Sequence, residues 1–216
     1  MARTARPTLT LAQILDAAAA VLEREGHGGL TMRAVAAELG VQAPAIYWHV
    51  KDKQALELAL FDHLQDSLVF EPKGVDWRQD LRDMGEALHA HMLAHRDIVS
   101  LLPHGFFYAP KSMARLDTVL GVLLRTGMAP RDAAYAFTTA FDYVANWARG
   151  EWAMRARPPG ERPGLDAAAK AQIFSGAFPN VALAFGAFAG EADLDAQFHF
   201  GLETLIAGFE RLVPKG

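Results

Sequence analysis

Apolar residues recur every three to four positions along most of the chain, which is the spacing of helices that bury one face. One stripe near the N-terminus comprises Leu11, Ile14, Leu15, Ala18, Val21 and Leu22. Another near the C-terminus comprises Leu194, Phe198, Leu202, Leu205, Ile206 and Phe209. No strand-like alternation of apolar and polar residues runs for any length. The pattern therefore predicts an all-α fold of about nine or ten helices.

Capping residues and helix breakers divide this pattern into segments. Thr10, Thr31 and Asp52 stand where N-caps are expected, and Gly40 supplies the left-handed residue that a sharp helix end needs. The proline-rich segment 155–164 is expected to be a loop. The expected helices span residues 11–25, 31–39, 43–49, 52–70, 77–95, 98–107, 112–126, 130–154 and 193–212, and residues 166–175 and 179–189 could form two more.

Composition narrows the class of protein. The 216 residues are 51% hydrophobic and 21% charged, which is typical of a globular chain and not of a disordered one. The chain has no cysteine, so disulfides and thiolate metal sites are excluded. Residues 1–10 lack the apolar core of a signal peptide, and no uncharged apolar run is long enough to span a membrane. A cytoplasmic protein is expected.

The charge is spread unevenly along the chain. The net charge of −4 argues against a protein that coats nucleic acid without specificity. Residues 1–53 nevertheless carry six basic and five acidic side chains, whereas the remainder carries 15 basic and 20 acidic ones. This mild asymmetry permits DNA binding by the N-terminal part.

Two short expected helices, 31–39 and 43–49, are joined at Gly40. This arrangement is typical of a helix-turn-helix, whose second helix enters the major groove of DNA. Helical hairpins in many other proteins share the spacing, so the residues themselves must decide. The run from Leu30 to Leu56, LTMRAVAAELGVQAPAIYWHVKDKQAL, closely resembles the DNA-binding domain of the tetracycline-repressor (TetR) family. Its Leu-Gly-Val, Tyr-Trp-His and Lys-x-Lys-x-x-Leu elements carry the resemblance, and YWHVKDK is closest to the tetracycline repressor itself.

The resemblance extends beyond this run. Trp77 with Asp80-Leu81-Arg82, the tripeptide His95-Arg96-Asp97 and the C-terminal FHFGLETLIAGFE are similar to later helices of the family. It implies a helix-turn-helix DNA-binding domain in residues 1–55 and a helical ligand-binding and dimerisation domain in residues 56–216. It also implies a ligand-responsive transcriptional regulator, in particular a repressor, that acts as a homodimer on double-stranded DNA.

The resemblance assigns roles to residues of the DNA-binding run. Arg33 matches an arginine that reaches a base edge, although a solvated surface arginine is the alternative. Tyr47 and Lys53 match residues that contact phosphate, and His49 could add another such contact. Trp48 could touch a phosphate or pack the small domain, and a role shared between the two is expected. The remaining candidates are Thr31, whose helix start could meet a phosphate, and the groove-facing Gln42, Ala43, Pro44 and Ala45.

Two of these positions indicate that the operator differs from that of the tetracycline repressor. Ala43 and Ala45 stand where the tetracycline repressor has polar side chains, and alanine makes only apolar contacts, for instance with a thymine methyl group. Arg33 and Gln42 would then provide most of the hydrogen-bonded readout. One such domain binds DNA poorly, so a palindromic operator bound by a dimer is expected.

The dimer surface should come from helices 130–154 and 193–212, which the family pairs in a four-helix bundle. Phe198, Leu202, Leu205 and Phe209 on the last helix provide more apolar surface than one subunit readily buries. The alternative is that all four belong to the core of a single subunit.

A small-molecule cavity is expected between the helices of the larger domain. In the tetracycline repressor, certain residues bind tetracycline and magnesium. The resemblance places the matching positions of this chain near Val69, Met84, Leu88, Leu102, Gly105 and Val119. None of these side chains can bind a hard cation, so a tetracycline–magnesium complex is not expected as effector, and no cofactor is expected. The expected effector is hydrophobic or aromatic and contacts Met84, Leu88, Leu102, His104, Phe106, Phe107, Met113, Leu116, Val119, Phe137, Phe141 and Trp147, unless these residues are simply core. Scattered polar side chains, His91 among them, could orient it.

Other functions are less well supported by the residues. His91 and His95 lie four positions apart, a spacing that can bind zinc, but no third ligand is evident and no metal site is expected. An enzyme is not expected, because no nucleophile–base pair, glycine-rich phosphate loop or pair of carboxylates stands out. A helical small-molecule-binding or interaction module without DNA function remains the alternative.

Overall fold

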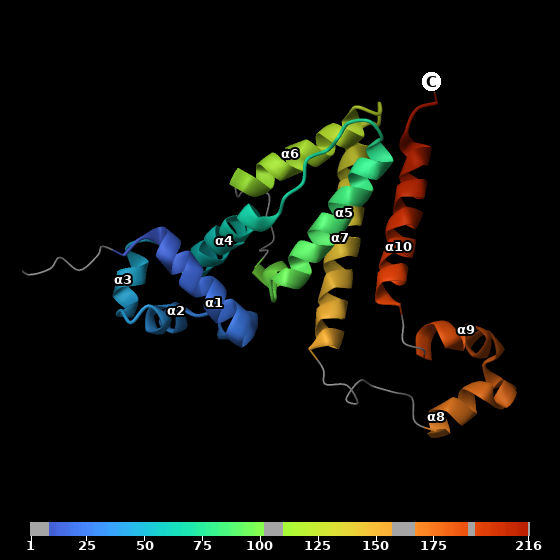
Figure 1. The fold of residues 1–216 in the computed structure, drawn as a ribbon, viewed down its shortest axis with the longest axis horizontal. Helices are drawn as coiled ribbons and strands as arrows, with labels where there is room; N and C mark the ends of the chain where they lie inside the picture. The colour runs from blue at the N-terminus through green and yellow to red at the C-terminus, as the bar shows by residue number, and fades with distance from the viewer. Residues whose placement is uncertain (1–8, 102–109, 157–166, 190–192, 216) are drawn as a thin grey trace, which may run out of the picture.

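The computed structural model describes residues 9–101, 110–156, 167–189 and 193–215. Within these residues the fold consists of helices and contains no strand, which confirms the predicted all-α class (Figure 1). None of the described helices combines the length and the apolar character needed to cross a membrane. The helices are α1 Leu11–Gly29, α2 Met32–Glu38, α3 Ala43–Tyr47, α4 Lys53–Leu64, α5 Trp77–Ala94, α6 Pro110–Leu124, α7 Pro130–Arg155, α8 Ala167–Gln172, α9 Pro179–Ala189 and α10 Leu194–Phe209.

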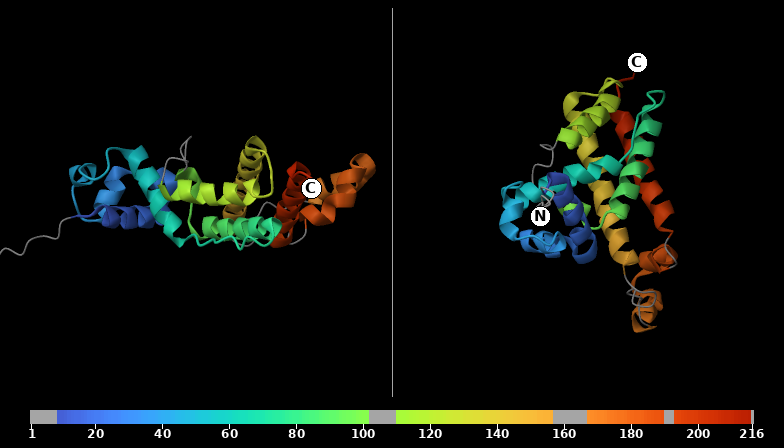
Figure 2. Two further views of the ribbon diagram at one scale, coloured as in Figure 1. Left: turned by 90° about the horizontal axis from the view of Figure 1, so that it is seen from above. Right: turned by 60° about the vertical axis from the view of Figure 1, so that its left-hand side comes forward.

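The helices form two parts that α4 connects. Helices α1, α2 and α3 make a small unit at one end, and α5, α7 and α10 lie side by side in the larger part (Figures 1 and 2). Helix α4 packs on α1 and also on α6 and the 3₁₀ turn Ile98–Leu101. The predicted domain boundary between residues 55 and 56 lies inside this connecting helix, and it stays a prediction.

Local capping defines the starts of the first helices. The Thr10 hydroxyl accepts a hydrogen bond from the Gln13 amide, and the Gln13 side chain accepts one from the Thr10 amide, which completes a capping box. The Thr31 hydroxyl accepts from the Ala34 amide at 3.1 Å, and the Asp52 carboxylate accepts from the Ala55 amide at 2.8 Å. All three predicted N-caps are therefore confirmed.

The turn between α2 and α3 depends on a residue with positive φ. Gly40 has φ of 64°, and two bonds close the end of α2: the Gly40 amide donates to the Ala37 carbonyl and the Val41 amide to the Ala36 carbonyl. This pair of bonds is the Schellman motif, which satisfies carbonyls that a helix end would otherwise leave free. It aims the chain sharply into α3, as the sequence predicted.

Helix α4 is shorter than predicted. The helix was expected to continue to Phe70, but it ends at Leu64 and passes into a 3₁₀ turn, Gln65–Ser67. The Ser67 hydroxyl donates to the Leu64 carbonyl at 2.9 Å, and such a local side-chain bond competes with helix continuation. Leu68 then turns into the core, which brings the following residues to the cavity described below.

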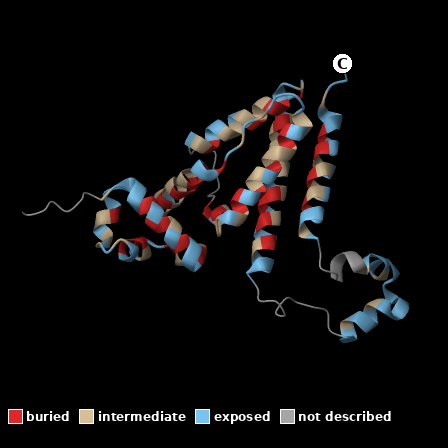
Figure 3. Cartoon of the chain, viewed as in Figure 1, coloured by how far each residue is buried: buried red, intermediate tan, exposed pale blue. Residues whose placement is uncertain are grey.

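The C-terminal helix buries its apolar stripe within one subunit. Phe198, Leu202 and Phe209 are all buried, because α10 packs on both α5 and α7 (Figure 3). The expectation that these three side chains supply a dimer surface is thus wrong for the isolated chain, and Leu205 is also partly covered. The exposed phenylalanine of α10 is Phe200, with 76% of its surface accessible.

The tripeptide His95-Arg96-Asp97 joins the two parts of the protein. The Arg96 guanidinium donates to the backbone carbonyls of Glu23 and Arg24, both at 3.1 Å, just before α1 is kinked at Gly26. The Asp97 carboxylate accepts from the His27 amide at 2.9 Å. Carbonyls near a helix end lack intrahelical partners, so these bonds hold the end of α1 against the larger part.

Candidate functional site

Helix α3 lies on the outer side of the small unit, away from the larger part (Figure 1). Ile46 and Val50 are buried beneath it and fix its orientation. The opposite side is open: Gln42, Pro44, Tyr47, Trp48 and His49 are exposed, and Ala43 and Ala45 are partly exposed. Thr31, the N-cap of α2, and Arg33, in the first turn of α2, are exposed as well. Together these residues form the candidate surface for DNA.

Several polar side chains of this surface are free to bind. Gln42 is the N-cap residue of α3, but its side chain makes no capping bond. Arg33 takes part in no ion pair with any residue that the structure describes. The Lys53 ammonium lies 3.4 Å from Glu57, a pair four residues apart on α4. Ion pairs four residues apart on a helix are worth about 0.3–0.5 kcal/mol. Glu57 also lies 2.8 Å from His27 Nε2, so it keeps a partner when a phosphate binds Lys53.

Trp48 has no structural role in the free chain. Its side chain is 88% exposed, so it contributes nothing to packing the small unit. This excludes the packing alternative that the sequence left open. A large aromatic side chain so fully exposed costs solvation free energy, which a binding partner would recover.

A cavity of about 110 Å³ lies inside the larger part, between the end of α4 and helices α5, α6, α7 and α10. One buried water needs only about 10–15 Å³, so the cavity has room for an organic molecule. Most of its wall is apolar, which favours an apolar ligand body. Its lining includes six of the predicted residues: Met84, Leu88, Leu116, Val119, Phe137 and Phe141.

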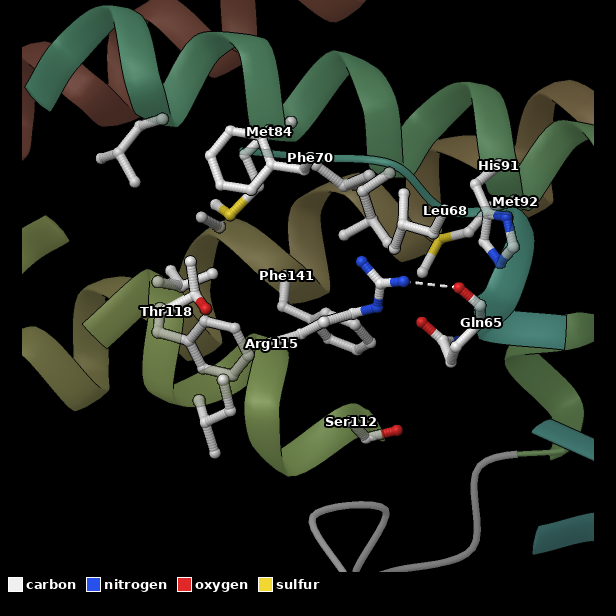
Figure 4. Close-up of a pocket in the computed structure, with 18 of the residues that line it drawn as sticks. Gln65, Leu68, Phe70, Met84, His91, Met92, Ser112, Arg115, Thr118 and Phe141 are labelled. Carbon is white, nitrogen blue, oxygen red and sulfur yellow. Dashed lines mark hydrogen bonds between the residues drawn. The ribbon is translucent and has the colours of Figure 1, made fainter. Parts of the chain in front are cut away.

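Polar side chains gather at one end of this cavity (Figure 4). The Arg115 guanidinium donates from Nη2 to the Gln65 backbone carbonyl at 2.5 Å, and Nδ1 of His91 lies 3.3 Å from the Ser67 hydroxyl. Ser112 lies on α6 three residues before Arg115, and its side chain also lines the cavity. Three buried polar atoms at this end have no hydrogen-bond partner among the described residues: His91 Nε2, Ser112 Oγ and Arg115 Nε.

Two family profiles match this chain. One, described as "Bacterial regulatory proteins, tetR family", matches residues 14–60, and the other, "Tetracyclin repressor-like, C-terminal domain", matches residues 71–213. The chain belongs to the TetR family. It is therefore a transcriptional regulator with a helix-turn-helix domain and a C-terminal helical domain, as the sequence predicted.

Similar TetR-family proteins cover almost the whole chain. The class A tetracycline repressor from transposon 1721 of Escherichia coli is 31% identical over 205 residues, or 92% of this chain and 89% of the repressor. The class G tetracycline repressor of Vibrio anguillarum is 29% identical over 209 residues, 92% of each chain. Among solved structures, ActR of Streptomyces coelicolor in complex with actinorhodin has a TM-score of 0.79 and 26% identity, covering 95% of this chain and 97% of ActR.

Not every residue predicted to contact an effector lines the cavity of this TetR-family chain. Met113 is exposed on the outer side of α6, because its neighbour Ser112 faces inward. Trp147 packs near Tyr143 and Phe198, with ring centroids 6.1 and 6.5 Å away, instead of facing the cavity. The other predicted members, Leu102, His104, Phe106 and Phe107, lie outside the described residues.

The polar end of the cavity was missed by the sequence reasoning. Gln65, Ser112 and Arg115 line the wall there, Thr118 lines it toward the other end, and none of the four was predicted as an effector contact. A usable signal existed for α6, since Ser112, Arg115 and Val119 share one helical stripe by their spacing. Polar residues on an otherwise apolar inward stripe are better explained by a site than by solvation.

His91 and His95 lie side by side, with ring centroids 4.8 Å apart, and both approach the Ser67 hydroxyl. Among the residues that the structure describes, no group of three or more histidine, aspartate or glutamate side chains is placed to hold a metal ion. Burial, followed by the positive charges of His95 and Arg115, lowers the pKa of His91 to about 4. This histidine is therefore neutral at physiological pH.

The lowered pKa of His91 predicts how stability changes with pH. The unfolded chain binds the proton near pH 6.5, whereas the folded chain resists it until about pH 4, so stability is lost as pH falls between these values. We expect H91Q to lose about 2 kcal/mol less stability than the parent between pH 7 and pH 4.5, in urea unfolding without ligand.

A matched control for this experiment is H199Q. The Asp195 backbone carbonyl, at 2.8 Å, and then Glu86 raise the pKa of His199, so this group favours the folded state as pH falls. H199Q should therefore change the pH dependence weakly and in the opposite direction. Identical pH profiles for H91Q and the parent would mean that His91 is protonated in the folded protein as easily as in the unfolded one.

Proposed function

We propose that this protein is a ligand-responsive repressor that binds a palindromic operator as a homodimer and leaves it when an effector enters the cavity. The observation that carries the proposal is the placement of α4, which runs from the exposed DNA-facing surface to the polar end of the cavity (Figures 1 and 4). The relatives are regulators of transcription, and we assign no catalytic role to the chain.

On the operator, α3 lies in the major groove. Arg33 and Gln42 donate hydrogen bonds to base edges, and Ala43, Pro44 and Ala45 make apolar contacts there. Phosphates on either side are bound by Thr31, Tyr47, Trp48, His49 and Lys53, which set the position of the helix without reading sequence.

The dimer forms through the outer faces of α7 and α10. Tyr135 of α7 is 63% exposed and Phe200 of α10 is 76% exposed, so both helices keep apolar side chains that the subunit does not cover. Two copies joined through these helices present two α3 helices to half-sites about one helical turn apart.

Effector binding reaches the DNA-facing surface through contacts between α6 and α4. The Lys111 amide donates to the Asp62 carboxylate at 2.9 Å, and the Lys111 ammonium pairs with Asp66 at 2.6 Å. Arg115 adds its bond to the Gln65 carbonyl. A ligand that displaces α6 therefore moves the end of α4, and α4 swings the small unit as a pendulum. The ligand acts only through its higher affinity for the state that does not bind DNA.

A tetracycline–magnesium complex does not suit this cavity. The described residues of the cavity wall include no carboxylate, and the Arg115 guanidinium repels a cation. ActR has been solved in complex with actinorhodin, and a single-residue variant of TetR from Acinetobacter baumannii AYE in complex with minocycline, so similar proteins bind small organic molecules. We propose a largely apolar effector of a different kind.

The direct test is a fluorescence anisotropy titration of the protein with DNA from upstream of its own gene. We expect one palindromic segment to bind two chains, with an affinity that falls steeply as salt rises, because several phosphates are contacted. A scrambled segment of the same composition is the control. Equal binding to both DNAs, or none to either, would contradict the proposal and favour a ligand-binding module without DNA function.

A further inference from the structure

The cavity is built with two unlike ends. In Figure 4, Met84, Phe70 and Thr118 lie toward one end, whereas Arg115, Gln65, His91 and Ser112 lie toward the other. An apolar molecule would be bound fully by the first end alone. The polar end has to be explained separately, because buried polar groups are costly unless they are hydrogen-bonded.

Arg115 has no direct ion-pair partner among the described residues, and Asp66 and Asp62 stabilise its charge only from a distance. Its guanidinium stays ionised at neutral pH although burial lowers its pKa, and its hydrogen-bond acceptor among the described residues is the neutral Gln65 carbonyl. The nearest carboxylates are engaged elsewhere: Asp66 pairs with Lys111, and Asp62 accepts from the Lys111 amide. Arg115 forms no ion pair with a described residue, and the sequence of residues 102–109 contains no acidic side chain.

Hydrogen-bonding capacity is also left over at this end. Among the residues that the structure describes, Arg115 Nε carries an N–H without an acceptor, and Ser112 Oγ has no partner. His91 Nε2 is likewise unpartnered, and the His91 residue is only 6% exposed. A carboxylate has two oxygens that accept several hydrogen bonds and match the planar fork of a guanidinium. The Arg115 guanidinium, by contrast, would repel a cation.

We infer that the effector is an organic monoanion, with an apolar ring or chain in the body of the cavity and a carboxylate bound by Arg115 and Ser112. The inference rests on the proposed function of the cavity as the effector site. A single charge fits because one guanidinium faces the cavity and the neighbouring His91 is neutral. A doubly charged phosphate ester would leave one charge without a partner in an apolar enclosure.

The inference can be tested without DNA. Isothermal titration calorimetry at pH 7.5 would compare octanoate, decanoate and naphthalene-2-carboxylate, each beside its own primary amide. The acid and the amide share size and shape but differ in charge. We expect at least one acid to bind about tenfold or more tightly than its amide, which is the usual worth of a charge-assisted hydrogen bond.

Variants of Arg115 test whether its guanidinium causes the preference for the acid over the amide. R115M should abolish the preference for the acid while keeping the apolar contacts, and R115K should restore part of it, because lysine keeps the charge without the fork. R125M, which removes an exposed arginine just after α6, is the matched control and should behave like the parent. Thermal melts check folding, and R115M should melt at the same temperature as the parent or higher, because an unpaired charge is removed from the interior.

The outcomes separate this inference from the proposed function. Failure of every acid to bind, equal affinity for acid and amide, or an unchanged preference in R115M would overturn it. None of these results bears on operator binding, which the anisotropy titration measures in the absence of ligand. A neutral apolar compound that released the operator while acids did not would leave the repressor proposal standing and refute the anionic effector.

Discussion

Replacing Arg33 by glutamate is expected to lower operator affinity at least a hundredfold. Each bidentate contact between arginine and guanine is worth about 1–3 kcal/mol, and a dimer makes the contact in both half-sites. The reversal also places a negative charge against DNA. The Arg33 side chain is exposed and unpaired among the described residues, so the substitution should not disturb folding. Anisotropy titrations of the parent and R33E on the same operator measure the effect.

Reversing the charge of Lys53 should also weaken DNA binding, but with a different dependence on DNA sequence and salt. K53E should weaken binding to every sequence and reduce the salt dependence, because an ammonium that contacts phosphate does not read bases. R131E is the matched control: it makes the same charge change on an exposed side chain at the start of α7, far from α3 (Figure 1). If both R33E and K53E bound the operator as tightly as the parent does, the DNA-facing surface would be misassigned. If the protein were a ligand carrier without DNA function, all three variants would keep their ligand affinity.

Replacing Phe198 by alanine is expected to destabilise the protein by about 3–5 kcal/mol, the usual cost of removing a fully buried phenylalanine ring. Phe198 is only 1% exposed. Its ring stacks on His89, with the ring centroids 4.0 Å apart, and its centroid lies 5.9 Å from that of Tyr143. Helices α5, α7 and α10 thus meet at this ring. Since a typical domain is stable by only about 5–15 kcal/mol, the loss should be large in urea unfolding at fixed protein concentration.

Phe200 on the same helix is the matched control. With 76% of its surface exposed, F200A should leave the folding of the subunit almost unchanged but raise the fraction of monomer in sedimentation experiments. The two phenylalanines are only two positions apart, so their contrast tests which face of α10 is core and which is interface. A stable F198A protein, or an F200A dimer as tight as the parent, would contradict this division.

Much of the DNA-binding unit could be predicted because its determinants are close together in the chain. A cap such as Thr31 depends on an amide three residues away, and the end of α2 depends on the backbone of Gly40 alone. The residues YWHVKDK indicated the TetR family, and the profile match over residues 14–60 confirms it. Exposure of Trp48 could not be predicted, because an aromatic residue in a small helical unit can equally well pack inward.

The limits of the sequence show most clearly in the larger part. The sequence predicted Met84, Leu88, Leu116 and Val119 as effector contacts, and they do line the cavity. It also placed Phe198 and its neighbours on one face, but it could not tell whether a second helix of the same subunit or another subunit covers that face. The packing of α10 on both α5 and α7 decided the question.

The sequence by itself determined the fold class, the helix starts and the helix-turn-helix, since each follows from backbone preferences and contacts within one or two turns. Only the tertiary structure decided that α4 ends at Leu64, that Trp147 faces away from the cavity and that Arg115 is enclosed without a counter-ion. An arginine on a helix is solvated unless other elements cover it. Here α4 and α5 provide that cover, and the sequence does not record which helices will meet.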